Sequence, residues 1–284
     1  MMESVDIQYS VFDPTGNITA LVESDVETGL QPSVAAEIME RRPEVEQVGF
    51  VRLQPGGEGL SLRMAGGEFC GNATMSAAAL YLIRCSERRG APLPLGEEET
   101  VCLRVSGAAR PVEVRLRAEV PDCFHAGVHM PPALSIDDRK FSYGPLSGKL
   151  PVVWLEGICH IVVEPCSVFW VLLADRAGAE DAIRDWCATL LAGGLGLMFL
   201  GGDASQRCLT PLVYVPGSGT VFWESSCASG STAAGMYLAA KTGVSVDLNL
   251  QEPGGVLRVV SDPTPVRGET WLYGRVKLAE QCQM

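Results

Sequence analysis

Short runs of apolar residues recur along the 284-residue chain, and Gly, Pro and Asp separate them. Runs of about four to eight residues rich in Val, Leu and aromatic side chains are typical of β-strands. The loosest stretches are residues 144–150 and 216–220, and residues 90–99 are expected to form a solvated loop. The pattern predicts strands over residues 7–11, 19–22, 47–53, 60–64, 101–105, 112–116, 152–155, 160–163, 169–173, 197–200, 212–215, 221–223, 256–260 and 271–278, and another between His125 and His129.

Four segments carry a helical pattern instead. Residues 32–41 and 179–191 are amphipathic, whereas residues 72–85 and 229–241 are nearly all small or apolar. A helix that is apolar on every side is expected to be buried. We therefore predict an α+β fold in which the two apolar helices run through the interior.

The two apolar helices also belong to an internal similarity. The segment Glu68–Leu82 resembles Glu224–Leu238, and Cys70 and Cys227 lie 157 residues apart, about half the chain. Two buried helices of small residues could match by chance. Because the Glu, Cys and Tyr-Leu positions agree as well, the similarity favours two copies of one supersecondary unit.

Composition narrows the function classes. The chain is 47% hydrophobic and 20% charged, which suits a sizeable core and two domains of about 140 residues. A net charge of −12 argues against a nucleic-acid partner, and no run of about 18 apolar residues predicts a membrane span. The N-terminal residues lack the pattern of a secretory signal, so a cytoplasmic location is expected. A homodimer is left open.

Ten cysteines raise the question of metal sites and disulfides. None forms a C-x-x-C pair, and no tight Cys/His cluster indicates zinc, so we expect free thiols and neither metal nor cofactor. Eight are interpreted as inert, namely Cys85, Cys102, Cys123, Cys159, Cys166, Cys187, Cys208 and Cys282.

Cys70 and Cys227 differ because each precedes one of the two apolar helices. The first N–H groups of a helix lack internal partners and carry partial positive charge, so they can bind a carboxylate. A thiol placed there is expected to have a lowered pKa. If two such sulfurs approached one α-carbon from opposite sides, one could remove its proton while the other supplied a proton. Buried cysteines that merely pack are the alternative.

Several segments resemble, in the same order, motifs of the diaminopimelate epimerase family of cofactor-independent racemases and epimerases. The cysteine motifs are the most specific of them, and the similarity covers nearly the whole chain. These segments are Glu68–Ala73, Ser226–Ser231, Pro14–Val22, Glu46–Val48, Gly157–Val163 and Gln251–Leu257.

The resemblance implies two pseudo-symmetric domains, each a mostly antiparallel β-barrel around a central helix. One would comprise residues 1–127 completed by 274–284, and the other residues 128–273. Cys70 and Cys227 would be the acid–base pair acting on a small amino-acid substrate. The remaining site residues implied are carboxylate-binding N–H groups at Gly71, Asn72, Ala228 and Ser229, with Asn17 and Gln47 touching substrate and His160 beside the thiols.

Two glutamates just before the cysteines, Glu68 and Glu224, could orient the substrate ammonium group or tune a thiol. The alternative is favourable placement at a helix N-terminus.

Departures from the family pattern bear on the substrate. The Glu-Arg pair that grips the distal carboxylate of diaminopimelate is replaced by Val215–Ser218, and two family Asn positions are Ile158 and Gly194. A buried carboxylate without its Arg would be costly, so diaminopimelate is disfavoured. The motif forms are more similar to the branch that contains histidine racemases. Epimerases for diaminopimelate, hydroxyproline or another amino acid, a thiol redox protein and a non-catalytic binding protein stay as alternatives.

Overall fold

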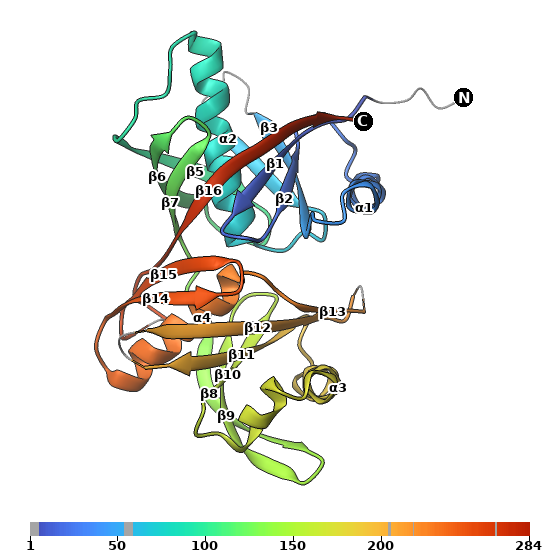
Figure 1. Cartoon of the computed structure of the whole chain (residues 1–284), viewed down its shortest axis with the longest axis vertical. Coiled ribbons are helices and arrows are strands. Elements are labelled where there is room, and N and C mark those ends of the chain that lie inside the picture. Colours follow the sequence, from blue (N-terminus) through green and yellow to red (C-terminus); the bar gives the residue numbers. More distant parts are fainter. Residues whose placement is uncertain (1–5, 54–58, 204–205, 218, 265) are drawn as a thin grey trace. The chain divides into compact units, whose positions relative to one another are not determined.

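The chain folds into two compact units, one of Met1–His129 with Tyr273–Met284 and one of Met130–Leu272. The computed structural model describes residues 6–53, 59–203, 206–217, 219–264 and 266–284. Both units mix helices with strands (Figure 1). None of the helices in those ranges is long and apolar enough to cross a membrane.

The first unit is a ring of strands around one helix. Its elements are β1 (Gln8–Pro14), β2 (Thr19–Val22), α1 (Gln31–Arg41), β3 (Gln47–Leu53), β4 (Leu60–Met64), α2 (Gly71–Arg89), β5 (Glu98–Val105), β6 (Val112–Val120), β7 (Cys123–His129) and the part of β16 (Thr270–Gln283) from Tyr273 onward. The strands follow the order β1-β2-β3-β4-β5-β6-β7-β16, and β16 also pairs with β1, which closes an eight-stranded barrel.

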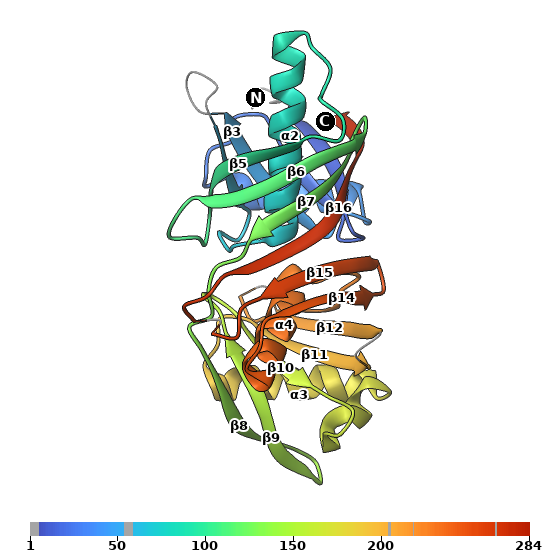
Figure 2. The ribbon, with the colours of Figure 1, turned by 90° about the vertical axis from the view of Figure 1, so that its left-hand side faces the viewer.

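Helix α2 runs inside this barrel and packs against each of β1 to β7 (Figure 2). Every residue from Gly71 to Leu80 is buried. Most of these side chains are small, so the strands can approach the helix closely on all sides. The helix ends at Gly90, which adopts the left-handed φ of 62° that terminates helices. The prediction of a buried apolar helix is confirmed here.

The second unit is built on a sheet in the order β8-β9-β10-β11-β12-β14-β15, with β13 paired to β12. Helix α4 packs against β9, β10, β11, β14 and β15. Among the described residues no pairing joins the two ends of this sheet. The elements are β8 (Ser135–Tyr143), β9 (Leu146–Trp154), β10 (Cys159–Val163), η2 (Val168–Leu173), α3 (Arg176–Leu190), β11 (Leu195–Gly202), β12 (Arg207–Val215), β13 (Thr220–Trp223), α4 (Ala228–Thr242), β14 (Val246–Glu252) and β15 (Gly255–Ser261).

Both units use the same sequence of connections. In the first, β1–β2 is antiparallel, β2–β3 is parallel across α1, β3–β4 is antiparallel and β4–β5 is parallel across α2. In the second, β9–β10, β10–β11 across α3, β11–β12 and β12–β14 across α4 repeat these directions. Helices α2 and α4 therefore occupy equivalent places, so the similarity seen between two segments extends to the strand order.

The structure corrects some expected elements. Residues 169–173 are not a strand but part of the 3₁₀ helix η2, because the Ser167 hydroxyl caps it by accepting from the Phe169 N–H at 3.2 Å. Strands β8 and β14 were not expected, and β9 begins inside the stretch 144–150 that looked loose. In the predicted loop 216–220, Ser218 lies outside the described residues.

Candidate active site

Cys70 is the N-cap residue of α2 and has extended backbone angles. Its sulfur accepts from the Ala73 N–H at 3.4 Å and donates to the Gln47 side-chain oxygen at 2.8 Å. Gln47 is the first residue of β3, so this strand holds the thiol at the N-terminal end of α2. Cys70 is half-buried.

The other predicted residues of the first unit lie in segments that meet at Cys70 or at its neighbour Gln47. The Asn17 amide donates to Glu46 at 2.8 Å, and the N–H groups of Glu46 and Gln47 donate to the Ile18 carbonyl at 2.9 and 3.4 Å. These bonds fix the β1–β2 turn against the start of β3. Asn72 follows in the first turn of α2 and is 1% exposed. The structure thus brings Asn17, Gln47, Cys70, Gly71 and Asn72 together within one unit.

Cys227 is the corresponding N-cap of α4. Its sulfur accepts from the Gly230 N–H at 3.3 Å, lies 3.6 Å from the Ser229 hydroxyl and is buried, with 4% of the residue exposed. A Cβ atom at Gly230 would lie 2.2 Å from the Met198 sulfur and 3.0 Å from the Cys227 sulfur. Only glycine leaves this space, so the first turn of α4 is packed closely on its thiol.

Glu252, at the end of β14, was not among the predicted site residues. One carboxyl oxygen accepts from the Cys227 N–H at 2.7 Å, and the other is bonded to the Ser231 hydroxyl. The residue is 2% exposed, and burial raises its pKa to about 8. At pH 7 the group is therefore mostly protonated. Glu252 lies within Gln251–Leu257, one of the segments that resemble family motifs, but nothing in that motif marked it as a site residue.

The pKa of Cys227 contradicts the sequence expectation. Burial raises it well above its usual range, and the carboxyl groups of Glu224 and Glu252 raise it further, while the Ser229 hydroxyl lowers it. Removing a thiolate from water costs more than the partial positive charge of one helix end returns. The raised pKa favours the thiol over the thiolate at Cys227 near neutral pH.

His160 lies on β10 opposite Gly196 of β11 and is fully buried. A Cβ atom at Gly196 would lie 2.2 Å from the ring Nδ1, so the glycine makes room for the imidazole. Burial lowers the pKa of His160 to about 3, which keeps the ring neutral. Neither ring nitrogen has a hydrogen-bond partner among the described residues.

The buried polar atoms without hydrogen-bond partners belong to predicted site residues or to Ser226, the residue before Cys227. Within the described ranges they are the side-chain oxygens of Asn17, Asn72 and Ser226 and both nitrogens of His160. Each such atom costs about 1–3 kcal/mol unless a ligand or water satisfies it. The first-turn N–H groups of Gly71, Asn72, Ala228 and Ser229 also lack acceptors among the described residues, as helix geometry dictates. Both cysteine-capped helix ends thus present unsatisfied donors and acceptors.

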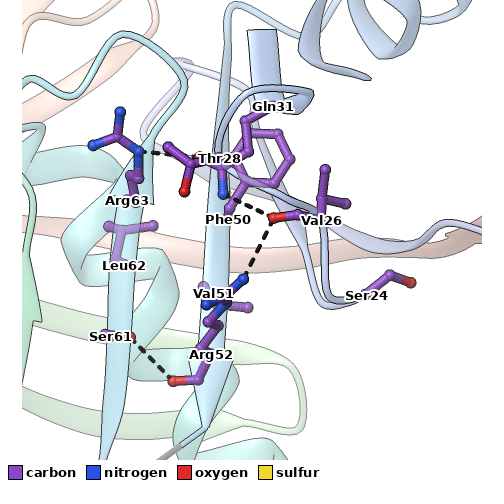
Figure 3. Close-up of a pocket in the computed structure, with 10 residues that line it drawn as sticks. All are labelled: Ser24, Val26, Thr28, Gln31, Phe50, Val51, Arg52, Ser61, Leu62 and Arg63. Carbon is purple, nitrogen blue, oxygen red and sulfur yellow. Dashed lines mark hydrogen bonds between the residues drawn. The ribbon is translucent and has the colours of Figure 1, made fainter. Parts of the chain in front are cut away.

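The pocket drawn in Figure 3 provides a contrast. It lies in the first unit and contains none of the predicted site residues. Its polar groups bond one another: Gln31 accepts from Arg63 at 3.1 Å and donates to the Val26 carbonyl at 3.3 Å. These groups are satisfied within the protein, unlike those beside the cysteines.

Comparison with known proteins gives the family. The family model described as "Histidine racemase CntK N-terminal domain" matches residues 6–279. The chain belongs to this histidine racemase family. A histidine racemase from Staphylococcus aureus is 28% identical over 259 residues, covering 90% of this chain and 88% of the relative. One from Fusobacterium nucleatum is 29% identical over 82% of this chain and 81% of its own length.

The fold has relatives among solved structures. A probable proline racemase from Agrobacterium radiobacter superposes with a TM-score of 0.66 at 13% identity, covering 98% of this chain and 92% of that one. At this identity the similarity shows the fold alone. The predicted family resemblance, including the branch with histidine racemases, is confirmed by the family match.

Proposed function

We propose that this protein is a histidine racemase that interconverts the L and D forms of the free amino acid. Membership of the family supports the reaction and the substrate. The observation that carries the proposal is the set of unsatisfied buried polar atoms around two helices capped by cysteines. Such groups suit a small zwitterion, which offers both hydrogen-bond donors and acceptors.

The proton transfer would use both thiols. The thiolate of one cysteine takes the α-proton, so an S–H bond forms and the C–H electron pair passes into the substrate carboxylate. The thiol of the other cysteine then gives its proton to the opposite face of the α-carbon, and the protonation states of the two sulfurs are exchanged. The N–H groups of Gly71, Asn72, Ala228 and Ser229 would stabilise the extra negative charge.

The remaining residues would orient the substrate and the thiols. Gln47 holds the Cys70 sulfur at 2.8 Å. Asn17 and the neutral ring of His160 have unused hydrogen-bonding atoms, and Glu224 would accept from the substrate ammonium group. The two predicted domains, residues 1–127 with 274–284 and residues 128–273, would each contribute one cysteine. The second barrel, the homodimer and the cytoplasmic location stay predictions.

Proton exchange in heavy water tests this function. L-Histidine incubated with the protein in D₂O should acquire deuterium at its α-carbon and lose optical rotation, followed by NMR and polarimetry. Cys70→Ser and Cys227→Ser should each abolish racemisation, whereas Cys166→Ser, at an exposed cysteine, should not. Absence of exchange with histidine, or faster exchange with diaminopimelate or hydroxyproline in the same panel, would refute the proposed substrate.

A further inference from the structure

A buried carboxyl group lies at the N-terminal end of α4 and takes no part in the proton transfer proposed above. Glu252 accepts from the Cys227 N–H and is bonded to the Ser231 hydroxyl, so it joins the N-cap residue to the next turn of the helix. The turn after β14 is fixed as well, because the Gly254 N–H donates to the Ser225 carbonyl at 2.7 Å. Glu252 is therefore held rigidly beside Cys227.

The equivalent thiol of the first unit has different surroundings. The Cys70 sulfur donates to the neutral amide of Gln47. The strand equivalent to β14 is β5, which ends at Val105, and the following Ser106 hydroxyl donates to the Glu68 carbonyl at 2.8 Å. A buried carboxyl thus bonds the N-cap residue of one cysteine helix, and an apolar residue ends the matching strand in the other unit.

We propose that Glu252 is a positioning residue that shares a single negative charge with Cys227. While neutral, it holds the start of α4 and allows the sulfur to become a thiolate. Once ionised, it keeps the sulfur protonated. This inference deepens the proposed racemase function, and its importance for catalysis rests on that function.

The charges around the pair favour this sharing. Glu224 is the other carboxyl group that acts on both, and it raises the pKa of Cys227 and of Glu252. No cation forms a salt bridge with Glu252 in the described part of the chain, and Arg258 on the neighbouring strand β15 pairs with Asp247 instead. In the backbone register of β12 against β14, Arg207 lies opposite Leu250 and Cys208 lies opposite Gln251.

Two buried groups of this kind cannot both be ionised cheaply, so they titrate as a pair. Burial raises the pKa of Glu252 to about 8. Below that pH the carboxyl is neutral and leaves the thiol free to ionise. Above it the carboxylate opposes the thiolate. The thiolate fraction of Cys227 should therefore level off above about pH 8. It should rise again only at the higher pH at which the thiol ionises beside a charged Glu252.

The substitution Glu252→Gln tests the charge while keeping the hydrogen bonds. Its amide can still accept from the Cys227 N–H and donate to Ser231. Cys227 would be labelled with iodoacetamide across pH 6–11 without substrate, and the labelled peptide quantified by mass spectrometry. A like charge shifts a neighbouring pKa by about one unit or more. We expect about tenfold faster labelling of Cys227 at pH 9 and little difference at pH 6.

Controls separate charge from structure. Glu156→Gln makes the same change at an exposed residue and should leave the pH dependence of Cys227 unchanged. Labelling of Cys70 in the same samples is an internal control. Slow access of the reagent to a buried sulfur affects all variants alike, so the shape of the curve is compared.

Identical pH dependence in the wild type and Glu252→Gln would overturn the inference. If the variant did not fold, the wild-type curve alone would decide, because the inference requires it to flatten above about pH 8 and a single unbroken rise would refute it. None of these readings uses histidine. The labelling result therefore stands if histidine shows no exchange, and the exchange result stands if Glu252 has no effect.

Discussion

At the residue scale, two glycines shape the surroundings of Cys227 and His160. Gly196 lies under the imidazole of His160 and the methyl group of Met198, and Gly230 lies under the sulfur atoms of Met198 and Cys227. Met198 therefore lies between the His160 ring and the Cys227 sulfur. Because a Cβ atom added at either glycine would lie 2.2 Å from a neighbouring side-chain atom, neither position accepts a larger residue without movement.

Gly196→Ala should displace His160. The new Cβ would lie 2.2 Å from a rigid, fully buried ring, and overpacking of this kind costs about 1–3 kcal/mol. We expect at least a tenfold loss of kcat/KM for histidine, measured by circular dichroism of the racemising solution. Gly217→Ala adds the same methyl group where nothing lies within 4 Å and should behave as the wild type. Unchanged activity in Gly196→Ala would show that His160 has no role.

Much of the site at this scale could be predicted, but not its electrostatics. The cysteines and Asn17, Gln47 and His160 sit in local motifs, so their sequence neighbourhood was enough to make them candidates. Glu252 is 25 residues from its partner Cys227 and meets it only through the packing of β14 on α4. The direction of the Cys227 pKa was wrong for the same reason. Burial and carboxyl groups from other segments outweigh the local helix end.

At the scale of elements, each cysteine helix is fixed at both ends. Besides its N-cap thiol, α2 carries Arg84, which bonds Glu23 just after β2 at 2.6 Å. Helix α4 carries Lys241, bonded to Glu164 just after β10. Each basic residue follows its cysteine by 14 positions. The repeat thus places a cation–carboxylate pair at the same point of both units, where it joins the helix to the end of a neighbouring strand.

Glu164→Gln should loosen α4. Burial alone would raise the pKa of Glu164, but hydrogen bonds from Lys241 and Tyr237 lower it overall. A lowered carboxyl pKa stabilises the fold above the unfolded value and loses that effect as pH falls through the folded value. We expect a loss of about 1–2 kcal/mol at pH 7, measured by urea unfolding, that shrinks below about pH 4. The control is Glu156→Gln at an exposed residue, which should change neither the free energy of unfolding at pH 7 nor its dependence on pH.

The elements that sequence patterns missed share a physical reason. Strand β8 (SIDDRKFSY) has a single buried residue, and β14 (VDLNLQE) has two, so neither shows a clear apolar face. The segment 169–173 has strand-like composition, yet Ser167 starts a 3₁₀ turn there. The four helices were found because their periodicity or uniform apolarity is strong. Weakly buried strands depend on their pairing partners, which a local pattern does not contain.

At the scale of the whole molecule, the chain uses one topology twice and completes the first copy with its last strand. Residues Val276–Gln283 of β16 pair with β1, and Ile7 and Met284 exchange two backbone hydrogen bonds of 2.8 and 2.9 Å. Tyr273 stacks on His125 at 5.9 Å and lies against Gly127. The first unit therefore depends on residues that are synthesised after the second unit.

Removing Tyr273–Met284 should consequently unfold the first unit and spare the second. Loss of this strand opens the barrel between β1 and β7, removes the buried side chain of Val276 and leaves two unpaired strand edges. Hydrogen–deuterium exchange read by mass spectrometry should show α2 amides losing protection by orders of magnitude. The amides of α4, whose packing strands all belong to residues 130–272, should stay protected as the internal control. Equal protection of α2 in the full and shortened chains would mean that seven strands hold the helix without closure.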